Sequence, residues 1–160
     1  MNCPNPPTVL DAFHVVKLGS AMVDEVRRRV QQDTLGHRGR KGGSLYGIRR
    51  TLQIGVEHLT DKHAARLAAK VIAGNPDDGV TLAWRCYQNL RDIYHARPEP
   101  GTRERCHRVI PLLPDPEVAR LGRTLKQWTT GVLAYFETNG ASHGPTEVID
   151  GVIETTHRIA

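Results

Sequence analysis

The sequence has few cysteines and few aromatic residues, and it contains no long apolar run. Its three cysteines are scattered and form no CxxC pair, which argues against a disulfide framework and a zinc ribbon. No apolar stretch approaches the roughly 18 residues of a membrane span. The first seven residues have neither the basic nor the apolar region of a signal peptide. We therefore expect a cytoplasmic protein with reduced thiols and no membrane partner.

Alternating apolar and polar residues, which are typical of half-buried strands, are almost absent. Apolar residues instead step by three and four, most clearly along 16–30 and 118–136. The second stretch includes Trp128, for which this pattern predicts a place in the core. We expect a mainly all-α protein, a multi-helix bundle with one short strand near Val9.

Capping and breaking residues divide the chain into the expected helices. Thr60 is a candidate N-cap, Gly74 a candidate stop, and 75–79 a turn. The expected helices cover about 12–32, 45–56, 60–74, 80–96, 102–112 and 116–138, with a last one from 146. A glycine-rich, basic loop at 36–43 follows the first helix.

The chain of 160 residues is long enough for one domain, and its net charge is +5 with a pI near 9.4. This balance favours acidic partners, of which nucleic acid is the commonest. Basic residues gather in the first third, at 27–29, at Arg38, Arg40 and Lys41, and at Arg49 and Arg50. They are candidates for contacts with DNA phosphates. A solvated helix face followed by a disordered loop is an equally open reading.

Three strings occur in a characteristic order. The chain has TVLDAFH at 8–14, LGRTLKQW at 121–128 after a long helical stretch, and GPTEVIDGVIE at 144–154. This ordered set resembles the DDE transposases of bacterial insertion sequences, specifically the ISL-three type.

The resemblance implies a partial catalytic domain of the RNase H-like class over 1–160. Residues 8–33 would form the strand and helix of the second Asp, 45–138 the helical insert, and 146–160 the helix that carries the Glu. Asp11 then matches the second Asp and Glu147 the Glu. In the family such carboxylates hold Mg²⁺ for DNA strand cleavage and transfer. DNA is the implied partner.

The family's first catalytic Asp has no counterpart in this sequence, so we expect a truncated family member that is inactive alone. With the central strands missing, the first helix should expose Val and Met side chains, a patch that self-association or a full-length transposase would cover. Spacing alone also allows Asp11 to be a helix N-cap and Glu147 part of a solvated acidic face. A non-catalytic helical DNA-binding or regulatory module is therefore the alternative.

Overall fold

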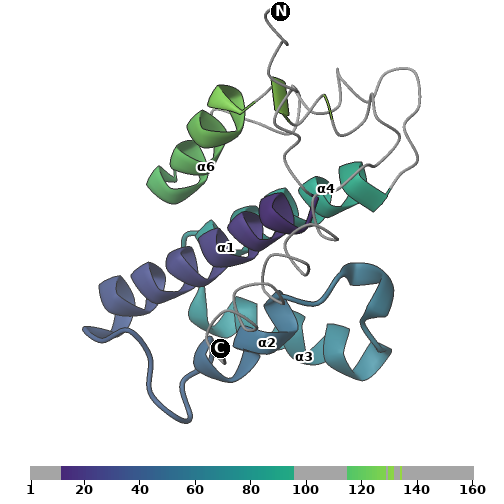
Figure 1. Ribbon diagram of the computed structural model, residues 1–160. Helices are drawn as coiled ribbons and strands as arrows, with labels where there is room; N and C mark the ends of the chain where they lie inside the picture. The colour runs from purple at the N-terminus through teal and green to yellow at the C-terminus, as the bar shows by residue number, and fades with distance from the viewer. Residues whose placement is uncertain (1–11, 96–114, 129, 132–133, 135–160) are drawn as a thin grey trace, which may run out of the picture.

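The computed structural model describes residues 12–95, 115–128, 130, 131 and 134, and these residues form helices and connecting turns (Figure 1). The elements are α1 (Ala12–Leu35), η1 (Tyr46–Ile48), α2 (Arg49–Leu52), η2 (Val56–His58), α3 (Asp61–Gly74), α4 (Gly79–His95) and α6 (Pro116–Gln127). The mainly helical class is confirmed, and no strand occurs in the described ranges. The expected strand near Val9 and the expected helices at 102–112 and from 146 lie outside them.

Helix α1 is the centre of the arrangement. Figure 1 shows α4 running along α1, with α6 on one side of it and α2 and α3 on the other. Gly19 lets α1 and α4 approach closely, because a Cβ atom there would lie 2.9 Å from a ring carbon of Tyr87. Three α1 side chains, Val15, Val23 and Val26, are completely buried. The prediction of an exposed Val and Met face on this helix is therefore wrong, since the neighbouring helices cover it.

The expected single helix at 45–56 is also wrong, because the segment divides into η1, α2 and η2. Side chains of α4 satisfy the backbone groups at this break. The Tyr87 hydroxyl donates to the Gln53 carbonyl at 3.0 Å. The Gln88 amide donates to the Ile54 carbonyl at 3.1 Å and accepts from the Val56 N–H at 3.0 Å. A helix that α4 holds in this way can end early without leaving buried backbone groups unpaired.

The predicted ends of α3 and the turn after it are confirmed. The Thr60 hydroxyl accepts from the His63 N–H at 3.3 Å, as an N-cap does. Helix α3 ends at Gly74, and the Asn75 side chain accepts from the Val80 N–H at 3.0 Å. This contact anchors the start of α4.

Helix α6 ends at Gln127, and Trp128 is its C-cap with 41% of its surface exposed. The core position predicted for Trp128 is wrong, because this residue follows the last residue of α6 and its side chain is exposed. Trp84, in contrast, is partly buried and packs against the main hydrophobic core. Within the described part of the chain, none of the helices is long and apolar enough to cross a membrane.

Candidate nucleic-acid interface

The positive charge of the chain is concentrated in one segment, residues 36–74, which we call the basic segment. It contains eight Lys or Arg and two Asp or Glu, an excess of six, whereas the whole chain has a net charge of +5. The remaining residues are therefore close to neutral as a group. A cationic surface that could bind an anionic partner should therefore lie on this segment.

The loop at 36–43 presents three exposed cations, Arg38, Arg40 and Lys41. Its path is set by Gly39, which has a φ of 112° and lies against the buried side chain of Gln31 in α1. A Cβ atom at Gly39 would lie 2.7 Å from the Gln31 Oε1 atom, so only glycine fits there. The loop is thus seated on α1 with its basic side chains facing solvent.

Helix α2 adds two exposed arginines directly after the loop and η1. Arg49 is 60% exposed, and its Nε atom lies 3.3 Å from Oδ1 of Asp24 in α1. Arg50 is exposed and forms no ion pair with any described residue. Both remain available for an anionic partner.

Helix α3 carries a further basic row that the sequence reasoning missed. Lys62, Arg66 and Lys70 are four residues apart, which places them on one face of the helix. Arg66 donates to the Gly47 carbonyl at 3.5 Å, and this contact brings the row beside the start of α2. Leu67 is the one buried residue among those of α3. The regular spacing of these three cations in the sequence could have revealed the row.

The arginine run at 27–29, a DNA candidate in the sequence, is largely used inside the fold. Arg27 is 4% exposed; its Nε and Nη2 atoms lie 2.9 and 2.7 Å from Asp24 Oδ1, and its Nη1 bonds to Gln31. Arg29 reaches α6, where it pairs with Asp115 and, at 2.9 Å, with Glu117. Arg27 is therefore excluded as a phosphate contact, and Arg29 joins α1 to α6.

The ion pairs of Arg29 also affect its ionisation. Partial burial by itself lowers the pKa of this guanidinium, but hydrogen bonds and charges from Glu117 and Asp115 outweigh that effect and leave the pKa raised. Arg29 therefore stays charged, and its ion pairs between α1 and α6 depend on this charge.

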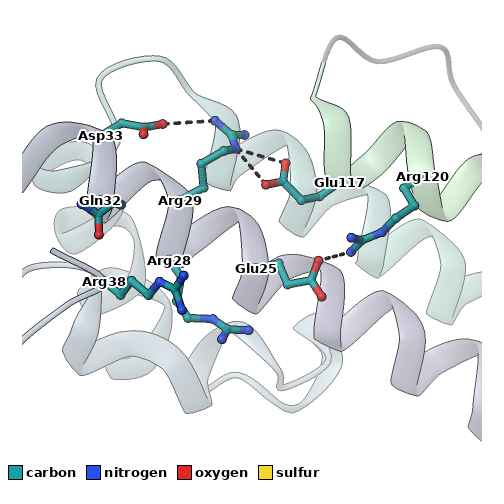
Figure 2. A pocket seen from close by; sticks show the side chains of 8 residues that line it. All are labelled: Glu25, Arg28, Arg29, Gln32, Asp33, Arg38, Glu117 and Arg120. Carbon is teal, nitrogen blue, oxygen red and sulfur yellow. Dashed lines mark hydrogen bonds and ion pairs between the residues drawn. The ribbon is translucent and has the colours of Figure 1, made fainter. Parts of the chain in front are cut away.

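A hollow of about 460 Å³ lies between α1, the loop and α6 (Figure 2). Eight residues line it: Glu25, Arg28, Arg29, Gln32, Asp33, Arg38, Glu117 and Arg120. Figure 2 shows Arg29 bonded to Glu117 and Asp33, and Arg120 bonded to Glu25, while no dashed line joins Arg28 or Arg38 to another residue drawn. The acids in this hollow are thus paired with two of its four arginines.

The acidic pair inferred from the family resemblance, Asp11 and Glu147, lies outside the described residues. Among the residues that are described, no group of three or more His, Cys, Asp or Glu could hold a metal ion.

Comparison with known protein families identifies the family to which this chain is similar. The family model of the DDE transposases of the ISL3 (ISL-three) type, described as a transposase family, matches residues 1–160. No curated protein and no solved structure matches the chain. Because the match covers the full length of the sequence, this chain belongs to the ISL-three family of DDE transposases.

Proposed function

We propose that the basic segment binds the phosphate backbone of DNA as part of a transposase. One observation carries the proposal: the entire positive excess of the chain lies on the loop, α2 and α3, on one side of α1 (Figure 1). Exposed Lys and Arg side chains neutralise phosphates and release counterions without reading the base sequence. We therefore expect binding that is nearly independent of sequence and that weakens steeply with salt.

The experiment measures the binding of a fluorescent DNA duplex by anisotropy at several salt concentrations. Each phosphate contact contributes about 0.9 to the slope of log affinity against log salt. Replacing Arg38, Arg40 and Lys41 together by Ala should therefore reduce the slope by about 1–3.

A matched control removes three exposed cations outside the basic segment, Lys17, Arg85 and Arg123, and so changes the net charge equally. Its slope should stay near that of the unaltered protein. Equal slopes for the two triple variants would show that net charge, and not the loop, governs binding.

The row on α3 gives a second test of the same surface. Replacing Lys62 and Arg66 by Ala should reduce the salt slope further, and the reduction should add to that of the loop variant because the two sets contact different phosphates. A reduced salt slope in the loop variant alone would confine the DNA interface to residues 36–50.

The family match also supports a proposal for the acidic pair. We propose that Asp11 and Glu147 act as ligands for Mg²⁺, which in this family stabilises charge during DNA strand cleavage and transfer. Binding of Mn²⁺, followed by electron paramagnetic resonance, should weaken in the Asp11→Asn and Glu147→Gln variants. Unchanged Mn²⁺ binding in both variants would remove the proposed site.

For the polypeptide of 160 residues by itself we propose no detectable strand cleavage, because two matched carboxylates are too few to fix a pair of metal ions. Mg²⁺-dependent cleavage that Asp11→Asn abolishes would overturn this.

A non-catalytic DNA-binding or regulatory module is the second candidate. It is favoured by the separation of the basic segment from Asp11 and Glu147 along the chain. Both readings predict DNA binding, but only this one predicts that Asp11→Asn and Glu147→Gln leave every measured property unchanged. An effect of either variant on Mn²⁺ binding would decide for the catalytic ancestry of the site.

A further inference from the structure

Asp24 is a buried carboxylate that faces three arginines from two helices. Its side chain is 10% exposed and lies near Arg27 and Arg28 of α1 and Arg49 of α2. One negative charge among three guanidinium groups leaves a local excess of two positive charges. Such an excess at the protein surface attracts an anion.

The three arginines use different atoms toward Asp24. Arg27 is buried, and its side-chain hydrogen bonds run inward, to Asp24 and Gln31. Arg28 approaches Asp24 through its Nε atom, which lies 3.3 Å from Oδ2 and donates to the Asp24 carbonyl at 3.3 Å. Arg49 also approaches through Nε, 3.3 Å from Oδ1. The terminal nitrogens of Arg28 and Arg49 form no hydrogen bond with the described residues.

This arrangement brings two partly exposed guanidinium groups to the same carboxylate. The Nε atoms of Arg28 and Arg49 are held at the two oxygens of one carboxylate, and the side chains are 43% and 60% exposed. Their four terminal nitrogens are left for an outside acceptor. Paired donors of this kind match the oxygens of a phosphate group.

We propose that Arg28 and Arg49 form a clamp for a single phosphate of the nucleic-acid backbone, with Asp24 as the positioning residue that orients both. The inference rests on the proposed DNA binding and extends it to a specific phosphate contact that joins α1 to α2. Arg28 also lines the hollow that contains Arg38, so the Arg28 side of the clamp lies next to the basic loop (Figure 2). A backbone that follows the basic segment can therefore continue onto α1.

The test is a double-mutant cycle on duplex DNA binding with Arg28→Ala, Arg49→Ala and the double variant. If both arginines hold one phosphate, the double variant should lose about 0.9 of salt slope, and each single variant should lose most of the affinity that the double variant loses. Additive losses with a slope change near 1.8 would show two separate phosphates and overturn the clamp. Unchanged affinity and salt slope in all three variants would also overturn the clamp.

Charge-conserving variants separate the clamp from simple attraction. Arg28→Lys with Arg49→Lys keeps both charges but removes the paired terminal nitrogens, and DNA affinity should fall at least fivefold. Arg85→Lys with Arg123→Lys is the control, because both arginines are exposed and lie outside the basic segment. Equal affinities of the two Lys variants would reject the clamp geometry. Helix content, measured by circular dichroism, should be the same for all of these variants.

A readout without DNA distinguishes failure of the clamp from failure of the proposed function. Inorganic phosphate is titrated into the protein while the Nε–H signals of its arginines are followed by NMR. Saturable shifts of Arg28 and Arg49 together, with Arg85 unmoved, support the clamp even if the loop variants leave DNA binding unchanged. Absence of such shifts overturns the clamp, whereas the proposed DNA surface is judged separately by the loop variants.

Discussion

Asp24 is the residue whose removal should damage this fold most among the charged side chains of α1. Replacing Asp24 by Ala leaves Arg27 in place, and Arg27 is only 4% exposed. Its Nε and Nη2 atoms would both lose their carboxylate partner. A buried guanidinium without a counter-charge retains its desolvation cost and gains nothing in return.

The magnitude follows from the burial of each pair. Breaking a buried ion pair from one side typically costs about 3–5 kcal/mol. The contacts of Asp24 with Arg28 and Arg49 add little, since those side chains are 43% and 60% exposed and solvent screens them. We expect Asp24→Ala to lower the unfolding free energy by about 3–5 kcal/mol. For a chain of this length, that is a fall in Tm of roughly 6–20 °C.

Urea unfolding followed by circular dichroism measures this loss. Asp33→Ala is the matched control, because Asp33 also pairs with an arginine of α1 but is 62% exposed at a distance of 3.7 Å. It should cost less than about 1 kcal/mol. Adding Arg27→Met to Asp24→Ala removes the unpaired charge and should recover part of the loss. Equal losses for Asp24→Ala and Asp33→Ala, or no recovery in the double variant, would refute the reasoning.

Two further predictions concern the loop and a pH-dependent contact. In urea unfolding, Gly39→Ala should lower the free energy of unfolding by more than about 1 kcal/mol. The loss should exceed that of Gly42→Ala, because both glycines have positive φ but only at Gly39 would a Cβ atom lie against Gln31. Equal losses would show that backbone strain alone matters. The pKa of Glu57 is lowered by a hydrogen bond from its own backbone N–H and by one from the Arg91 side chain. The ionised Glu57 carboxylate should therefore stabilise the fold fully above the ordinary glutamate pKa of about 4.3, and this stabilisation should be lost as the pH falls through the lowered pKa. The stability difference between the unaltered protein and Glu57→Gln should therefore shrink on acidification, and a difference that stays constant as the pH falls would contradict this.

The helices and their caps were predictable from the sequence because they depend on near neighbours. The Thr60 cap, the stop at Gly74 and a turn after it all follow from local backbone hydrogen bonding, and the structure confirms them, with the turn at 75–78 and Gly79 already in α4. The break within 45–56 was not predictable in this way. It depends on Tyr87 and Gln88, which lie more than thirty residues later and supply the hydrogen bonds that replace the helical ones.

The roles of the basic residues show the same division. The sequence by itself determined where the positive charge lies, since counting residues locates the excess in 36–74. It did not determine which arginines face solvent. Arg27 and Arg29 are two residues apart on α1, and so they point in different directions: Arg27 is buried against Asp24, whereas Arg29 pairs with Asp115 and Glu117 of a helix more than eighty residues away. Only the packing of α6 and α2 against α1 decided which cations hold the fold together and which remain for a partner, because that packing alone brings distant carboxylates within reach.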